Sequence, residues 1–404
     1  MTDTAALDPA DQKAFDRLLK ATPAWDGIET AGEAFGLDSN VLLHAGPPFE
    51  SIETISMPIL NSACVAAVFE GIAKDLDQAG AMIQAGEIKL KPAQDHSTVT
   101  PLAAVVSASM PMHRVRDITN PKNCIYAPIN GGSRPAMRLG LRSMAVVEHM
   151  RWLNGYFADL LAEGLSQQIE MIPIAVAALR QGDDCHGRTP MGTKLLMEII
   201  ENNIPKGITD PGTREFIDTS ASIFLNLWMA SSKCLMMSAS GVAESSLVTA
   251  VAGNGVDIGI QISALPGQWF QAPATAPTGR FDSDLPAHRA LPAIGDSAVV
   301  EGLGLGAMSI HLSPIQETNL ADFLPEDYRT RAERLMCGEH PSFGDLNCKL
   351  GLTARAVLGN HHGPIIGLGI LDITGEKGRI GGGIYDMPSN VFVDAMQALQ
   401  ALEA

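Results

Sequence analysis

One short segment of the chain concentrates side chains that could transfer protons and bind anions. It runs from Gly182 to Pro190 and contains Asp183, Asp184, His186 and Arg188 within six residues. Either aspartate could orient His186 as a general acid or base, and the guanidinium of Arg188 could hold an anion through two hydrogen bonds. The alternative is a polar turn in which the aspartates and the arginine only cap neighbouring helices.

The same segment precedes a predicted helix. Thr189 is a typical capping residue, and Pro190 suits the first helical position. Unpaired N–H groups at the start of a helix favour anions. The spacing of Asp183 and His186 does not match a known metal site, so no metal is predicted.

A second candidate lies at the end of a predicted strand. His44 and Gly46 follow the apolar residues 41–43, and two prolines then make the loop rigid. Ligands often bind where strands of an α/β layer end, and Gly46 would let the backbone approach closely. A lone histidine also occurs as part of the packing, so His44 has both interpretations.

Glycines and arginines gather around Asn130. Gly131 and Gly132 could form a nest of N–H groups for a phosphate or carboxylate, and Arg134 and Arg138 would add positive charge. A flexible hinge between domains is an equally good interpretation of the glycines, and the two are compatible.

Three further signals are weaker. Asp95 and His96 are adjacent, but neighbouring side chains often diverge; Asn254 belongs to an Asn-Gly turn, and Asp296 follows a glycine. Residues 301–306 have the spacing G-x-G-x-G rather than the G-x-G-x-x-G of dinucleotide sites. No nucleotide, flavin or haem cofactor is therefore predicted.

The elements that must position these residues fall into three parts. Residues 1–135 begin with a helical lead-in to about residue 35, followed by strands at 41–43, 88–91 and 103–107 and helices at 60–74 and 77–85. Residues 136–252 predict helices at 137–163, 166–180, 191–202, 213–240 and 244–252. Residues 253–404 predict strands at 256–262, 297–301, 308–312 and 365–373, a polar loop at 275–292 and a helix at 390–402. We therefore predict an α+β multidomain fold in which two α/β parts flank an all-helical domain.

Composition narrows the function. The formal charge of −17 argues against nucleic acid or an anionic membrane as a general partner, because both require a basic face. No signal peptide and no apolar run of membrane-spanning length is evident. Six cysteines without a C-x-x-C pair predict neither a disulfide scaffold nor a zinc site. These features favour a cytoplasmic protein.

Five segments, taken in order, resemble the YlbE/AllG-like family, which includes the large subunit of oxamate carbamoyltransferase. They are residues 44–48, 107–111, 182–188, 254–255 and 295–297, and the resemblance covers roughly residues 40–385. It implies carbamoyl transfer between oxamate and phosphate, with carbamoyl phosphate as product in the catabolic direction of allantoin breakdown. It also implies an FdrA-like partner subunit and a smaller third subunit.

Some residues depart from the family pattern. Asp184 and Gly187 stand where the family usually has glutamate and asparagine, and Gly131 stands where it tends to have an acid. The Ser-x-Arg-Thr phosphate motif of ordinary transcarbamylases is absent. Losing a carboxylate from a pocket changes its charge by one unit, so the substrate could differ from oxamate.

Together these observations predict an enzyme that acts at a carbamoyl or amide carbonyl. His186, oriented by Asp183 or Asp184, would move the proton, and His44 is assigned to the catalytic group. Substrate binding is assigned to Arg188, Arg134, Arg138, Asn130, Asn254, Gly46, His96 and Asp296. The alternatives are a hydrolase of a small or cyclic amide and a non-catalytic ligand-binding subunit. Helices rich in glycine and alanine suggest a homo-oligomer.

Overall fold

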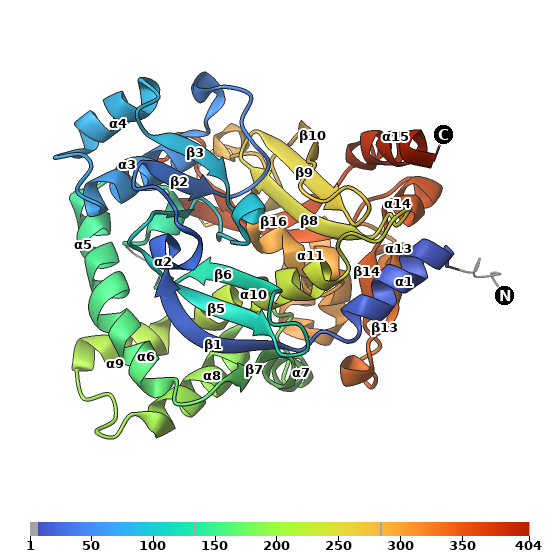
Figure 1. The fold of residues 1–404 in the computed structure, drawn as a ribbon, viewed down its shortest axis with the longest axis horizontal. Helices are drawn as coiled ribbons and strands as arrows, with labels where there is room; N and C mark the ends of the chain where they lie inside the picture. Colours follow the sequence, from blue (N-terminus) through green and yellow to red (C-terminus); the bar gives the residue numbers. More distant parts are fainter. Residues whose placement is uncertain (1–6, 133–134, 283–284, 404) are drawn as a thin grey trace.

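The computed structural model describes residues 7–132, 135–282 and 285–403. Helices alternate with five small sheets, which confirms the predicted α+β class (Figure 1). Among the strand pairs of the described chain, β2 with β3 is parallel and the others are antiparallel. The chain therefore lacks the continuous parallel sheet of a doubly wound nucleotide-binding fold in its described part.

The N-terminal segment is only partly the helical lead-in that the sequence predicted. Helix α1 is followed by strand β1, and β1 pairs with β5 and β7. The helical pattern of the local sequence does not decide the structure here. Residues 23–30 pair instead with strands distant along the chain, and this pairing buries Trp25 completely. The strands of this sheet are β1 (Pro23–Thr30), β5 (Pro111–Asp117), β6 (Cys124–Pro128) and β7 (Ile169–Glu170). Helices α1 (Pro9–Leu18) and α2 (Ala31–Phe35) flank β1 in the chain.

A second small sheet, in the order β3-β2-β4, holds the predicted strands of the N-terminal part. Helices α3 and α4 pack on one another and α3 also packs on β2 and β4. The predicted elements are confirmed as β2 (Val41–His44), α3 (Met57–Phe69), α4 (Leu76–Gln84), β3 (Lys89–Pro92) and β4 (Val105–Val106).

The middle of the chain is mainly helical. α5 (Met144–Trp152) continues through a π-helical turn (Leu153–Phe157) into α6 (Ala158–Gly164). The helix predicted at 213–240 is divided at Ser220 into α9 (Pro211–Thr219) and α10 (Ile223–Ser238). The other helices are α7 (Met171–Arg180) and α8 (Pro190–Asn203).

Helix α10 forms the centre of the molecule. Thirteen of its sixteen residues are buried, and it contacts strands β5 and β6 on one side and β8 and α11 on the other (Figure 1). Apolar residues occur on every side of this helix, as expected for a helix that is enclosed all round.

Three predictions of element type were wrong. The helix predicted at 244–252 is strand β8 (Val248–Asn254), which is entirely buried and pairs with β9 and β12. The strands predicted at 297–301 and 308–312 are helical, in α11 (Val299–Leu303) and the 3₁₀ segment η7 (Gly306–Leu312). Each run is short and mostly buried, and apolar periodicity cannot separate a buried strand from a buried helix.

The C-terminal part contains three sheets. The first has the strand order β10-β9-β8-β12, the second β11-β16-β15 and the third β13-β14. The loop predicted at 275–292 contains strand β11, which pairs with β16. The bounds are β9 (Asp257–Ile262), β10 (Phe270–Pro273), β11 (Thr278–Phe281), β12 (Ile294–Gly295), α12 (Pro314–Leu320), α13 (Tyr328–Leu335), β13 (Met336–Glu339), β14 (Lys349–Leu352), α14 (Ala354–Asn360), β15 (Ile365–Leu371), β16 (Arg379–Asp386) and α15 (Val391–Glu403).

The parts share one large hydrophobic core. Its buried residues extend from Ala14 to Leu399, and α1 contacts both α10 and β13. The division into domains at 1–135, 136–252 and 253–404 stays a prediction. No helix in the described ranges has the length and apolar character needed to cross a bilayer.

Gly46 marks a close junction between the N-terminal and C-terminal parts. A Cβ atom at this position would lie 2.4 Å from the carbonyl carbon of Gly253 and 2.5 Å from the amide nitrogen of Asn254. The backbone of Gly46 is also left-handed, with φ of 85°. Both features require glycine.

Gly46→Ala should therefore lower the free energy of unfolding by about 2 kcal/mol or more, through backbone strain and overpacking. The matched control is Gly36→Ala, since Gly36 has a similar φ of 65° and nothing within 4 Å of the added methyl group. Urea unfolding should show a clearly smaller loss in the control. Equal losses would mean that the close approach at residue 46 contributes nothing.

Candidate functional site

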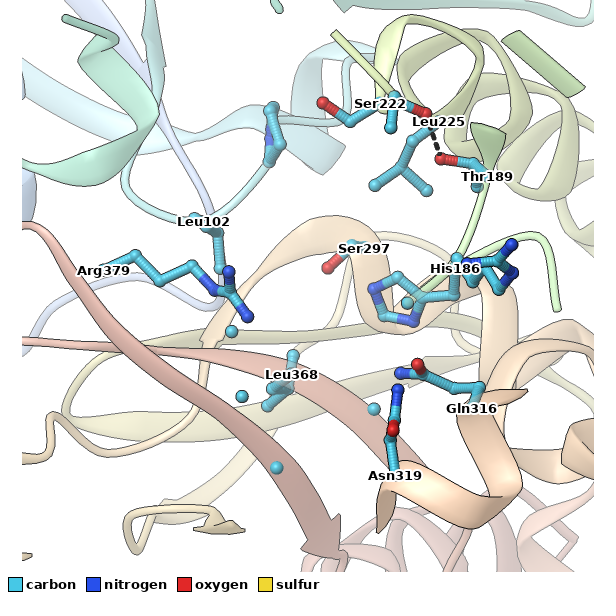
Figure 2. A pocket seen from close by; sticks show the side chains of 18 of the residues that line it. Leu102, His186, Thr189, Ser222, Leu225, Ser297, Gln316, Asn319, Leu368 and Arg379 are labelled. Atoms are coloured by element: carbon cyan, nitrogen blue, oxygen red, sulfur yellow. Dashed lines mark hydrogen bonds between the residues drawn. The ribbon is translucent and has the colours of Figure 1, made fainter. Parts of the chain in front are cut away.

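A cavity of about 730 Å³ is lined by residues from the N-terminal, middle and C-terminal parts of the chain. Figure 2 shows His186 and Arg379 reaching into it from different sides, with Ser297 between them. The wall is formed by segments around residues 101–102, 130–138, 186–190, 221–225, 280–282, 297, 316–320, 367–369 and 379–383. A site assembled in this way requires the complete fold.

His186 is paired with a carboxylate that the sequence did not suggest. Its Nδ1 lies 2.7 Å and 2.8 Å from the two carboxylate oxygens of Glu301 in α11. Glu301 is completely buried, and His186 is 7% exposed. Because Nδ1 faces Glu301, the opposite ring nitrogen, Nε2, is the one available to the cavity.

The pair changes the acidity of the imidazole. Burial by itself lowers the pKa of His186, but the negative charge of Glu301 and the hydrogen bond to it raise that pKa above its usual value. An imidazole whose pKa is set by a paired carboxylate can donate a proton in one direction of a reaction and accept it in the other.

The two aspartates predicted to orient His186 instead build the loop that carries it. Oδ1 of Asp184 accepts the backbone N–H groups of His186 and Arg188, each at 2.8 Å. Oδ2 of Asp183 accepts the N–H of Gly192 in the first turn of α8 at 2.8 Å. Burial raises the pKa of both carboxyls, that of Asp183 to about 6.

The sequence patterns around Glu301 predicted the end of a strand and excluded a nucleotide loop, and neither assigned the carboxylate a role. The available signal was a single acid inside an otherwise apolar, glycine-rich stretch, which is unusual for a buried position. Gly306 allows the geometry: a Cβ there would lie 2.3 Å from Oε1 of Glu301 and 3.0 Å from Cβ of His186. The carboxylate is held further by the N–H groups of Ala307 and Gly367.

Arg138 supplies a largely enclosed positive charge. Its guanidinium donates to Oδ1 of Asn130 and the carbonyl of Gly131, each at 3.1 Å, and to the carbonyl of Gly132. It forms no ion pair with a carboxylate of the described chain. Burial and the nearby positive charge of Arg379 lower its pKa to about 10, because both disfavour the charged guanidinium.

Three more arginines line the cavity. Nε of Arg188 lies 4.0 Å from Asp183. Arg280 and Arg379, from β11 and β16, form loose exposed pairs with Asp322 at 3.5 Å and Asp282 at 3.7 Å. Although the whole chain is acidic, this wall is basic.

Four of the predicted site residues lie elsewhere, at the junction around Gly46. Asp296 accepts N–H groups from Gly46 and Thr100 at 3.0 Å and 2.8 Å and is fully buried. The side chain of Asn254 donates to the carbonyl of Pro47. Their partners identify these residues as parts of the packing, and neither Gly46, Asn254 nor Asp296 lines the cavity.

His44 belongs to the same junction and also lies away from the cavity. Nδ1 lies 2.8 Å from the carbonyl of Ala45, the ring packs on Phe49, and burial lowers its pKa to about 4. His96 contacts Phe35 at a distance of 6.0 Å between ring centres and does not line the cavity either. Arg134 lies outside the described residues.

Neutral polar groups complete the wall. Gln316 and Asn319 project from α12, and Figure 2 shows both below the imidazole of His186. Ser297 and Ser222 add hydroxyl groups. Within the described ranges no cluster of three metal-binding side chains occurs.

Known proteins resemble this chain in fold and in sequence. The fold resembles the crystal structure of a conserved protein of unknown function from Enterococcus faecalis V583, with a TM-score of 0.90, 26% identity and 97% of each chain covered. The uncharacterized protein YahG of Escherichia coli K12 is 30% identical over 96% of this chain and 84% of its own length.

The family follows from two further matches. The profile of oxamate carbamoyltransferase subunit AllG matches residues 88–297. Oxamate carbamoyltransferase subunit AllG of E. coli K12 is 30% identical over 96% of this chain and 97% of its own length. The chain belongs to the AllG family, which confirms the resemblance seen in the sequence.

Replacing Glu301 by glutamine should shift the titration of His186 to lower pH. The substitution removes the charge that raises the pKa and leaves the burial that lowers it. NMR titration of the imidazole C–H signals measures this directly, with the His186 signal assigned from its loss in His186→Gln. Glu317→Gln is the control because Glu317 pairs with Arg329. An unshifted midpoint in the Glu301 variant would contradict the assigned pair.

Proposed function

We propose that this chain carries the site of a carbamoyl transfer between a small amide, oxamate or a close analogue, and phosphate. The observation that carries the proposal is the His186–Glu301 pair, which opens onto a cavity lined by arginines. Membership of the AllG family supports the reaction class.

The charges of the cavity suit these reactants. Oxamate is an anion and carbamoyl phosphate carries further negative charge, so their joint binding needs several cations. Arg138, Arg188, Arg280 and Arg379 provide four. Guanidinium groups suit both carboxylates and phosphates because they bind through two parallel hydrogen bonds.

His186 would move the one proton that the reaction requires. In the catabolic direction, a phosphate oxygen attacks the carbamoyl carbon of carbamoylated oxamate, and the bond from that carbon to the oxamate nitrogen breaks. The imidazolium of His186 gives its proton to this nitrogen. In the reverse direction the amide nitrogen attacks carbamoyl phosphate, phosphate leaves, and neutral His186 takes the proton.

The E. coli relative is named as a subunit, and we propose that this chain also works in a complex. The FdrA-like and smaller third subunits suggested by the sequence, together with self-association, are the proposed partners. A hydrolase of a small or cyclic amide would use the same histidine with water in place of phosphate. A ligand-binding subunit would bind these compounds without turnover.

Turnover by the purified chain distinguishes these functions. The wild type, offered oxamate with carbamoyl phosphate, should form carbamoylated oxamate and phosphate, and His186→Gln should lower the rate by about 10²–10⁴. His96→Gln is the control because His96 is outside the cavity. Release of ammonia in the absence of phosphate would contradict carbamoyl transfer and support the hydrolase. Binding of these compounds without turnover would support the ligand-binding subunit.

The two directions should respond oppositely to pH. Phosphorolysis needs protonated His186, so its rate should fall as pH rises through the raised pKa of this residue. Formation of carbamoylated oxamate needs the neutral ring, so its rate should rise over the same interval. Rate profiles at fixed substrate saturation test this, and parallel profiles in the two directions would contradict the assigned role.

Arg379→Ala should raise the KM for an anionic substrate about tenfold or more, since a charge-assisted hydrogen bond is lost. Arg379 is about half exposed, so the fold should tolerate the change. Arg379→Lys should recover part of the affinity. The control is Arg17→Ala, because Arg17 lies in α1 outside the cavity. An unchanged KM for every anionic substrate would exclude Arg379 from binding.

A further inference from the structure

Two neutral side chains line the cavity on the side where Figure 2 shows His186. Gln316 and Asn319 are three residues apart on α12, so they share one face of the helix. Figure 2 shows their carboxamide groups together, below the ring of His186, with Arg379 at the other side of the cavity. Neither carboxamide hydrogen-bonds to another residue of the described chain.

Two contacts place Gln316 beside the loop that carries His186. Ser313, which precedes α12, donates a hydrogen bond of 2.6 Å to the carbonyl of Gly182, so the helix is tied to the His186 loop. Nε2 of Gln316 lies against Gly187, only 2.5 Å from where a Cβ would stand. Glycine at position 187 therefore leaves the room that Gln316 occupies.

The chemistry of a carboxamide determines what it recognises. Each has N–H donors and a carbonyl acceptor, the same pattern as a primary amide of a substrate. A substrate carboxylate has no donor for the carbonyl oxygens and would call for a cation instead. The neutral wall is next to the histidine, where an amide nitrogen must lie to exchange its proton.

We infer that Gln316 and Asn319 are specificity residues that bind the primary carboxamide of the substrate. The inference rests on the proposed function and adds an orientation to it. The carboxamide lies against α12 and beside His186, and the carboxylate of the same molecule points towards Arg379. The pocket thereby distinguishes oxamate, which has one carboxamide and one carboxylate, from oxalate, which has two carboxylates.

The test compares binding of oxamate and oxalate to the full chain by calorimetry in the presence of phosphate. The wild type should prefer oxamate. Gln316→Leu and Asn319→Leu should each reduce the ratio of the two affinities about tenfold, the effect of one strong hydrogen bond. Thr318→Val is the matched control, because Thr318 lies between them and bonds to the carbonyl of Pro314.

Gly187→Ala offers a second route that leaves both carboxamides chemically intact. The added methyl group should displace Gln316 and lower the same ratio. Thermal unfolding checks that each variant is folded. A wild type that binds both compounds equally, or neither, overturns the inference, and so does an unchanged ratio in both leucine variants.

The outcome is separate from that of the proposed function. Preferential binding of oxamate, lost in the leucine variants, supports the inference even where no carbamoyl transfer is detected. Phosphate-dependent transfer by a chain whose preference is insensitive to Gln316 and Asn319 supports the proposed function and rejects the inference.

Discussion

The hydrogen bond between His186 and Glu301 is the interaction on which the candidate site depends. A buried carboxylate is costly unless it is paired, and here an imidazole and two backbone N–H groups, from Ala307 and Gly367, satisfy it. The same bond fixes which ring nitrogen faces the cavity. The contact that satisfies the buried carboxylate of Glu301 is therefore also the one that sets the pKa of His186.

The same contact explains the surroundings of the pair. The His186 loop is shaped by Asp184, which accepts two N–H groups of the loop. The Glu301 helix must approach closely, and Gly306 removes the side chain that would prevent it. The arginines then lie around a firmly held imidazole. This wall of the cavity is basic although the net charge of the chain is −17, because the charges are unevenly distributed.

The sequence predicted the class of the fold and the segment that carries His186. These rest on local patterns: apolar periodicity, a capping residue before a proline, and polar residues grouped in one loop. It failed where the answer depends on contacts distant along the chain. The local sequence of strand β8 predicts a helix, and only its pairing with β9 shows that it is a strand. Likewise, the sequence gives Glu301 no role, because its contact with His186 exists only in the folded chain.

The same limit applies to His44, Asn254 and Asp296. Their residue types and positions in loops are those of binding residues, yet each is satisfied by backbone groups of the junction around Gly46. Composition alone cannot distinguish a polar group that awaits a ligand from one that a neighbouring segment already satisfies. The reverse holds for Gln316 and Asn319. These side chains line the cavity, but nothing in their local sequence indicates a site.

His186 and Glu301 are 115 positions apart in the chain, and this separation matters for sorting related proteins. A relative that keeps the short acidic loop but has an uncharged residue in place of Glu301 would still look the same to a search for that loop. Its imidazole would lose the charge that raises its pKa and would be neutral over more of the physiological range. Grouping such proteins by the two positions jointly would separate different proton chemistries that a local signature treats as one.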